Sequence, residues 1–267
     1  MEEAETMELT DEQWAVLDPL IGEMPRRADR RGRPWRRSRA VLNGILWILR
    51  TGAPWADLPE RFAPYQTCHR RYQRWVREGR FERILEALAT DLLATDLKER
   101  GKLDLSECFI DGAFIAGENR GGCVGPTKRG KGTKLMAMAD RFGPPLAACA
   151  ASASPHESRL VAPTLDSRFI TELPQRLIGD RAYDADPLDA ELAKLGVEMI
   201  APHRRNRKRP KTQDGRPLRR YRRRWKIERL FAWLGNFRRL VVRYERYALN
   251  YLGFVQLGCI LILLRQG

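Results

Sequence analysis

The feature that most constrains this chain is an apolar run of strand length, residues 108–115, interrupted by one acid, Asp111. A carboxylate inside a buried strand costs free energy unless it is paired or binds a cation. Apolar side chains recur at helical spacing before this run, and shorter strand-like runs follow it. The sequence therefore predicts an all-helical region followed by an α/β region with a mixed sheet.

Four helices are predicted in the first hundred residues. Residues 10–13 resemble a capping box that opens the first helix. The second covers residues 38–51 with Gly52 as its stop, and Gln66 or Thr67 caps the third. The fourth runs over about residues 80–97, and the charged stretch 98–102 predicts a boundary. We therefore divide the chain into residues 1–98 and residues 99–267.

The third predicted helix has an apolar face and a basic face. Its basic side chains are Arg70, Arg74 and Arg77. A short turn followed by a helix with a basic exterior is what a helix-turn-helix needs to reach bases and phosphates in a major groove. An ordinary amphipathic helix with a solvated basic face has the same pattern, so both interpretations stay open.

In the second half, strands and helices alternate. Strands are predicted over residues 134–139 and 145–151, a helix over 154–169, a strand over 176–180, a helix over 187–195 and a strand over 197–201. Counted from the run around Asp111, the fourth strand ends in a second isolated acid, Asp180. If the first and fourth strands of a mixed sheet are neighbours, Asp111 and Asp180 lie close together.

Within the glycine-rich loop over residues 117–132, residues 125–131 begin like a nucleotide-binding P-loop. Gly132 stands where that motif needs Ser or Thr, so we predict no nucleotide cofactor. The loop either offers its cations to phosphates or is a solvated hairpin loop. The candidate DNA contacts in and after it are Lys128, Arg129, Lys131 and Lys134.

Positive charge is concentrated near the carboxyl end. The net charge is +15, and residues 201–246 hold 18 Lys or Arg and three acids. Interleaved aromatic residues argue against a disordered tail, so the pattern indicates a polyanion partner, with nucleic acid as the leading candidate. A helix-like run over residues 217–240 carries one acid, Glu228, predicted to share an inward stripe with Tyr221 and Arg224. Glu228 is either an ion-pair partner of Arg224 or a ligand for a cation.

Three acids, Asp111, Asp180 and Glu228, can converge if the last helix packs across the ends of the first and fourth strands. Carboxylates brought together repel one another unless cations neutralise them. Their hard oxygen donors suit Mg²⁺ or Mn²⁺, and two such ions form the clamp used in phosphodiester attack.

The motifs that contain these acids resemble a known family. The stretch Phe-Ile-Asp111-Gly, the stretch Gly-Asp180-Arg-Ala-Tyr183-Asp and the spacing Tyr221-x-x-Arg224-x-x-x-Glu228 resemble the three acid motifs of DDE transposases of the insertion-sequence four/five superfamily. The resemblance covers nearly the whole chain.

That resemblance implies an RNase H-like catalytic domain over residues 99–267, preceded by a helix-turn-helix-like DNA-binding domain over residues 1–98. It implies Asp111, Asp180 and Glu228 as catalytic and metal-binding residues, with Tyr183, Tyr221 and Arg224 near the site as DNA contacts. The reaction implied is cleavage at transposon ends and strand transfer into target DNA, with double-stranded DNA as partner and a homodimer or larger synaptic assembly. Gly235 stands where relatives carry a basic residue, and Arg238 or Arg239 is expected to substitute for it as a DNA contact.

The remaining features concern location. The five cysteines form no C-x-x-C pair, and the amino end lacks a signal-peptide pattern. The apolar run over residues 252–264 is too short to span a bilayer and predicts a buried final helix. We therefore expect a cytoplasmic, nucleoid-associated protein without disulfides.

Two alternative functions stay open. One is a DNA-binding regulator without chemistry, and the other is a metal-dependent nuclease that cuts without joining.

Overall fold

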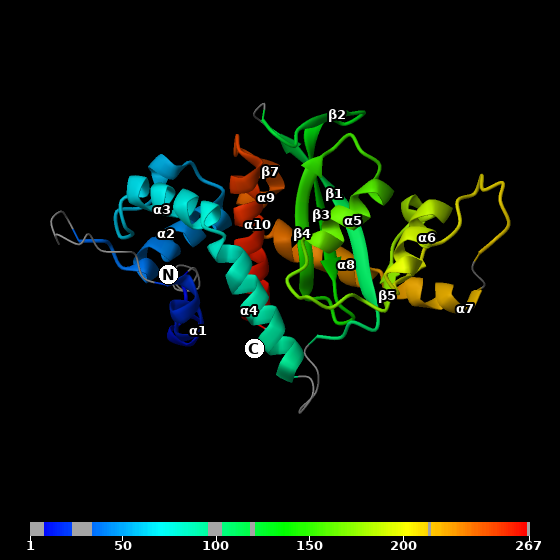
Figure 1. Cartoon of the computed structure of the whole chain (residues 1–267). Helices are drawn as coiled ribbons and strands as arrows, with labels where there is room; N and C mark the ends of the chain where they lie inside the picture. The colour runs from blue at the N-terminus through cyan, green and yellow to red at the C-terminus, as the bar shows by residue number, and fades with distance from the viewer. Residues whose placement is uncertain (1–7, 23–33, 96–102, 118–120, 213–214, 266–267) are drawn as a thin grey trace.

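The structure is a computed structural model that describes residues 8–22, 34–95, 103–117, 121–212 and 215–265 (Figure 1). The amino-terminal part is helical, as predicted. Its elements are α1 (Asp11–Ile21), α2 (Ser38–Thr51), the 3-10 turn η2 (Trp55–Asp57), α3 (Tyr65–Arg77) and α4 (Arg80–Thr95).

The ends of these helices follow local chemistry. The capping box at Thr10 and Gln13 opens α1, and Gly52, with a left-handed φ of 72°, ends α2, both as predicted. The predicted N-cap of α3, Gln66 or Thr67, is wrong by two or three residues. Its N-cap is Pro64, whose carbonyl accepts the first bonds of the helix from two backbone N–H groups. The predicted boundary at residues 98–102 lies outside the described residues.

A seven-stranded mixed sheet forms the centre of the second half of the described chain. Its strands are β1 (Cys108–Gly117), β2 (Gly125–Thr127), β3 (Gly130–Ala139), β4 (Pro145–Ser152), β5 (Arg176–Ile178), β6 (Glu198–Ile200) and β7 (Val242–Arg243). The order is β2-β3-β1-β5-β6, with β4 also on β3 and β7 also on β1. The first and fourth predicted strands, β1 and β5, are therefore parallel neighbours, as expected.

One edge of β1 is paired along its length with β3, and the other edge is paired only near its two ends. On that second edge β5 pairs with residues 108 and 109, and β7 pairs with residues 116 and 117. Within the described chain, the middle of this edge therefore has no strand partner. Asp111 stands in that gap.

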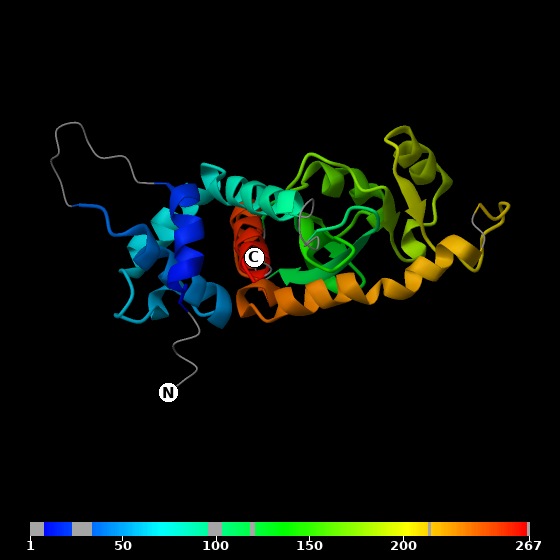
Figure 2. The same ribbon diagram turned by 90° about the horizontal axis from the view of Figure 1, so that it is seen from below.

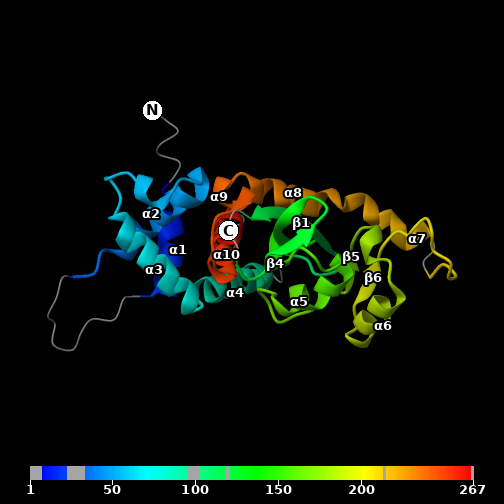
Figure 3. The same ribbon diagram turned by 90° about the horizontal axis from the view of Figure 1, so that it is seen from above.

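Between the strands lie short helices and turns. They are η3 (Glu157–Leu160), α5 (Val161–Asp166), η4 (Arg181–Tyr183), α6 (Asp186–Lys194), α7 (Gly215–Leu218), η5 (Arg219–Arg223), α8 (Trp225–Gly235), α9 (Arg238–Val241) and α10 (Ala248–Leu263). Figures 2 and 3 show α8 along one face of the sheet and α5 and α6 on the other side. The predicted helix over residues 154–169 is shorter than expected, since η3 and α5 together cover only residues 157–166.

The predicted continuous helix over residues 217–240 is wrong. It is divided into α7, the 3-10 turn η5, α8 and α9. Side chains three residues apart are aligned in a 3-10 turn, and Arg220 and Arg223 both use this alignment to pair with Glu107 at 2.6 and 2.5 Å. The buried acid just before β1 thus fixes a turn that helical periodicity did not predict.

The final helix, α10, is buried on nearly all sides, as predicted. It packs against α4 and α3 on one side and against β4 on the other, and Figure 1 shows it between the amino-terminal helices and the sheet. A single hydrophobic cluster therefore runs from the helices into the sheet. In the described part of the chain, no helix combines the length and the apolar character that a membrane crossing requires.

Candidate active site

The two strand acids lie at the same edge of the sheet because β1 and β5 are parallel and their pairing ends together. The last register pair joins Phe109 to Ile178, and Asp111 and Asp180 each stand two residues beyond it. After that pair β5 gives way to η4, so Asp111 faces a turn instead of another strand.

The Asp111 carboxylate is mostly buried and fully engaged. Its Oδ1 accepts from the Gly112 N–H at 2.9 Å, and its Oδ2 accepts from Arg224 Nη1 at 2.5 Å. Burial raises the pKa of Asp111, and the nearby Asp180 carboxylate acts in the same direction. An acid within a strand was predicted to be paired or bound to a cation, and it is paired.

Asp180 is the N-cap of η4. Its Oδ1 accepts from the Ala182 N–H at 2.7 Å, and the carboxylate is partly exposed. It borders an open pocket of about 420 Å³. The other residues that line this pocket are Arg181, Pro202, Leu218, Tyr221 and Arg224.

Glu228 lies in the first turn of α8, and its side chain is 56% exposed. The prediction that it faces inward is wrong. Because α8 begins only at Trp225, its buried face is set by Ile227, Leu230 and Leu234, and Glu228 stands beside that face. Its Oε1 accepts from Arg224 Nη2 at 2.6 Å.

Arg224 joins the two acids. One terminal nitrogen of its guanidinium binds Asp111 and the other binds Glu228, while the centre of the Tyr221 ring lies 5.9 Å from the guanidinium carbon. Of the two interpretations of Glu228, the ion pair with Arg224 is present in this structure, and the role of Glu228 as a cation ligand stays a prediction.

The three acids are near one another but do not form a preassembled metal site. Among the residues that the structure describes, no three His, Cys, Asp or Glu side chains are close enough to hold one ion. Asp111 and Glu228 are linked through Arg224, and Asp180 borders the same pocket as Arg224. Binding of one ion by all three would require the carboxylates to approach one another more closely.

The position of α8, and with it Glu228, is set by the turn between β3 and β4. Lys226 donates to the Arg141 carbonyl, and Arg229 donates to the Phe142 carbonyl. The turn is held by Asp140, which accepts from the backbone N–H groups of residues 104, 142 and 143. Burial raises the pKa of Asp140 to about 7.

Two predicted DNA contacts are buried. Tyr183 is fully buried, so its predicted contact with DNA is not supported. Its hydroxyl finds no hydrogen-bond partner among the described residues. Burial raises the pKa of Tyr183, and the carboxylates of Glu157, Asp111 and Asp180 raise it further. Arg239 is buried as well, paired with Glu245 at 2.7 Å, so a contact with DNA in place of the missing basic residue is not supported there.

The other predicted DNA contacts divide into exposed and engaged side chains. Arg74 pairs with Glu78 at 2.6 Å, and Lys134 is turned inward, where it donates to the Pro155 carbonyl at 3.0 Å. Those that are exposed are Arg70, Arg77, Lys128, Arg129, Lys131 and Arg238. Lys128 and Arg129 form the turn between β2 and β3, so the loop is a hairpin that presents both cations.

Sequence reasoning missed one acid that lies near the site, Glu157. The sequence analysis placed it only within a predicted helix over residues 154–169, yet it lies beside Gly112 and pairs with Lys134 at 3.4 Å. Its place five residues after the end of β4 carried no signal, because its approach to Gly112 depends on where the pairing of β1 with β5 ends.

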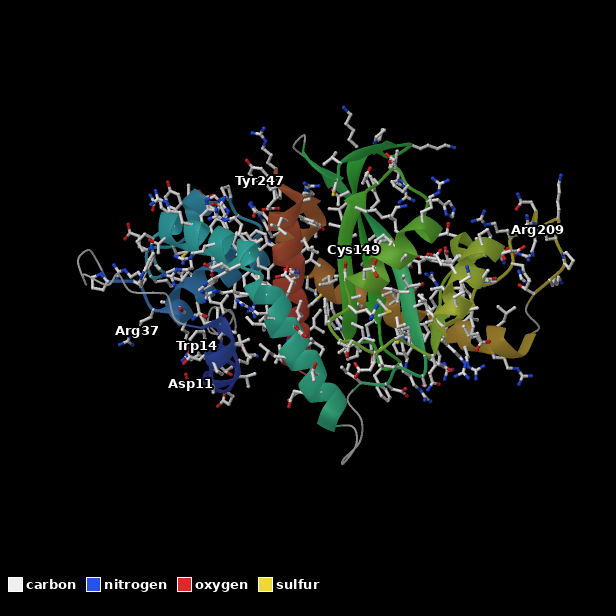
Figure 4. The ribbon with its side chains drawn as sticks, viewed as in Figure 1. Asp11, Trp14, Arg37, Cys149, Arg209 and Tyr247 are labelled. Atoms are coloured by element: carbon white, nitrogen blue, oxygen red, sulfur yellow. The ribbon has the colours of Figure 1, made fainter. Side chains whose placement is uncertain are left out.

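The basic segment after β6 is tied to the Asp180 turn. Asp184 accepts from the Arg204 N–H at 2.7 Å and pairs with Arg207 at 2.7 Å and with His203 at 3.0 Å. Arg209, which pairs with Asp186, is labelled in Figure 4 at the end of the molecule remote from α1 to α3. These bonds restrain the loop on which Asp180 stands.

Comparison with solved structures identifies the fold. A piggyBac transposase, solved by cryo-electron microscopy in a synaptic complex with hairpin DNA, superimposes with a TM-score of 0.52 over 98% of this chain and 73% of that chain, at 10% identity. The class is therefore an RNase H-like α/β fold preceded by helices, as the motifs predicted.

Sequence comparison gives the family. Residues 103–264 match the family described as "Transposase DDE domain", and residues 9–85 match "Putative transposase of IS4/5 family". The chain belongs to the DDE transposases, enzymes of DNA transposition, as its three acid motifs predicted.

Two relatives come from Burkholderia cepacia. The insertion element IS402 uncharacterized 16.2 kDa protein is 34% identical over 45% of this chain and 80% of its own length. The "Putative transposase for insertion sequence element IS402" is 34% identical over 51% of this chain, and the match spans 65% of that relative.

Proposed function

We propose that this DDE transposase cuts DNA at the ends of an insertion sequence and joins those ends to target DNA, with Asp111, Asp180 and Glu228 as its catalytic carboxylates. The observation that carries the proposal is the shared cation. Asp111 and Glu228 both bind Arg224, which borders the same pocket as Asp180. Carboxylates that converge in this way need a positive charge between them.

The residues fit a divalent metal. Their donors are carboxylate oxygens, which suit Mg²⁺ or Mn²⁺, and a cationic group already lies between two of them. We propose that Asp111, Asp180 and Glu228 hold two ions. When bound, such ions activate the attacking water or 3′-hydroxyl and stabilise the leaving oxygen.

A divalent ion held by Asp111 would compete with Arg224 for the carboxylate, so we expect Arg224 to move away from Asp111 when metal binds. Glu228 is more than half exposed at 56%, so its side chain can turn toward the pocket without unpacking the core. The released guanidinium, still beside the pocket, becomes available to a DNA phosphate.

Double-stranded DNA, as terminal inverted repeats and as target, is the proposed partner. The charge of +15 and the exposed cations of the β2–β3 turn and α3 support it. The piggyBac neighbour was solved as a synaptic complex with DNA. We propose in the same way a homodimer or larger assembly on two ends, and a nucleoid-associated protein. In this assignment residues 1–98 bind DNA and residues 99–267 catalyse.

The test is an assay with a DNA duplex that carries the inverted repeats flanking the gene, a target plasmid and Mg²⁺. We expect the wild-type protein to cut the ends and join them, and Asp111→Asn or Asp180→Asn to bind the duplex without doing either. Broken ends alone would identify a nuclease without joining activity. Full activity in either variant would reject the assignment of the acids.

A further inference from the structure

Glu157 stands where a fourth carboxylate can reach the acid pocket. It is the first residue of η3, which packs against η4, the turn capped by Asp180. Its Cγ and Cδ lie 3.3 Å from the position that a Cβ on residue 112 would occupy. Because successive residues of a strand face opposite sides of a sheet, Glu157 approaches from the face opposite to that of Asp111.

The gap on the edge of β1 makes this approach possible. Since β5 pairs only with residues 108 and 109, no strand of the described chain is paired with this edge of β1 beside Asp111. Burial raises the pKa of Glu157, and the carboxylates of Asp111 and Asp180 raise it further, so the three groups lie within electrostatic range of one another.

A buried hydroxyl beside this cluster indicates a ligand. Tyr183 is 0% exposed, and its hydroxyl oxygen finds no hydrogen-bond partner in the described part of the chain. The three carboxylates that most strongly oppose its ionisation are those of Glu157, Asp111 and Asp180. A buried donor left without a partner costs free energy, and a metal-bound water would accept its hydrogen bond.

We propose that Glu157 is a fourth carboxylate of the metal site, which binds a divalent cation together with Asp111 and Asp180. This inference rests on the proposed function. Lys134 balances the charge of Glu157 when no metal is bound, because its Nζ lies 3.4 Å from Glu157 Oε1 and is held in place by its bond to the Pro155 carbonyl. Lys134 is therefore part of the acid site and not of the DNA-contacting surface.

The first test is a calorimetric titration with Mn²⁺ of the full chain without DNA. We expect Glu157→Gln to weaken Mn²⁺ binding at least about tenfold. The matched control is Glu198→Gln, which removes a glutamate paired with Arg176 at 3.0 Å on β6, and it should leave binding unchanged. If Glu157 has only a structural role, Glu157→Gln should lower the melting temperature in EDTA and leave the Mn²⁺ affinity unaltered.

The same titration separates the two proposals. If Asp111→Asn weakens Mn²⁺ binding and Glu157→Gln does not, the fourth ligand is rejected while the proposed function stands. If the wild-type protein binds no Mn²⁺, or if Asp111→Asn binds it as tightly as the wild type, the proposed function fails and this inference with it.

A second variant tests the proposal by spectroscopy, without a measurement of affinity. Glu157→Cys places a thiolate, a soft ligand that prefers Cd²⁺, at the proposed position. We expect Cd²⁺ to produce an ultraviolet thiolate-to-metal absorption band in this variant, above the signal of the wild-type cysteines, and none in Glu198→Cys. Absence of the band from folded Glu157→Cys would overturn the proposal.

Discussion

The strand acids and the helix acid of this site are held in different ways. Asp111 and Asp180 stand two residues past the end of a parallel register, and both are bonded to backbone N–H groups close by in the chain. Glu228 is 56% exposed and bonded to one side chain, Arg224. The sheet positions two carboxylates, whereas the third is positioned by an ion pair at the surface.

This difference indicates that the helix acid, and not the strand acids, completes the site. A strand register cannot slip by one residue without turning every side chain to the wrong face, so the strand acids form the fixed part. The helix acid depends on α8, which is itself anchored through Lys226 and Arg229 to the turn between β3 and β4. Changes at Glu228, at Arg224 and at that turn therefore test the comparison separately.

The largest effect is expected from Glu228→Gln. Loss of one metal ligand removes several kcal/mol of transition-state stabilisation, so end cleavage should fall by about a thousandfold or more. The exposed side chain contributes little to folding, and the free energy of unfolding in EDTA should stay within about 0.5 kcal/mol of the wild type. Cleavage of labelled ends and urea unfolding measure the two quantities. Cleavage at the wild-type rate would remove the helix acid from the site.

A smaller effect, on stability, is expected from Arg224→Gln. It leaves Asp111, whose side chain is 19% exposed, without its counter-ion. The free energy of unfolding in EDTA should fall by about 1–3 kcal/mol, and Mn²⁺ should restore more stability to this variant than to the wild type. Arg70→Gln, a change at an exposed arginine, is the matched control. Equal stability of Arg224→Gln and wild type in EDTA would contradict the role of the ion pair.

Asp140 allows the anchoring turn to be tested by pH. Its pKa in the folded chain is about 7, above the ordinary value of 3.8, so between those values the folded state binds more protons than the unfolded state. The contribution of Asp140 to the free energy of unfolding is therefore fully present below pH 3.8 and is lost as the pH rises toward 7. Asp140→Asn should flatten that decline in urea unfolding across this range. An identical slope in the variant would show that Asp140 is not the titrating group.

The smallest effect is expected on the DNA-contacting turn. Replacing Lys128, Arg129 and Lys131 with Ala should weaken DNA binding and lower the slope of log affinity against log salt by about 0.9 for each phosphate that the turn no longer neutralises. Unfolding should not change, because all three are exposed. Lys194→Ala, at an exposed lysine of α6, is the control in a filter-binding titration. An unchanged salt slope would exclude this turn from the interface.

The two strand acids were easier to predict from the sequence than the helix that carries Glu228. Asp111 and Asp180 end or interrupt apolar runs, so their place at neighbouring strands could be predicted from burial cost and parallel connection. Helical spacing failed for residues 217–240, because Glu107, far away in sequence, pulls Arg220 and Arg223 into a 3-10 turn. Glu157 could not be predicted either, since its approach depends on how early the pairing of β1 with β5 ends. In both cases the structure depends on contacts between residues far apart in the sequence.

The burial of Tyr183 and Arg239 was not predicted from the sequence either. Motif position placed each of them near DNA, but packing decides exposure, and both lie in the interior. Arg239 pairs with Glu245 and donates to the carbonyls of Gly52 and Ala53, so it connects α9 to the end of α2. The position of Arg239 in a basic run therefore did not predict its partner, because Glu245, six residues later, pairs with it in the interior.

The measurement that tests the account most directly is an anomalous-scattering map of crystals grown with Mn²⁺. It should contain density about 2.1 Å from carboxylate oxygens of Asp111, Asp180 and Glu228, with the Arg224 guanidinium turned away from Asp111. Manganese bound elsewhere, or Arg224 still joining Asp111 to Glu228 in the presence of saturating metal, would contradict it.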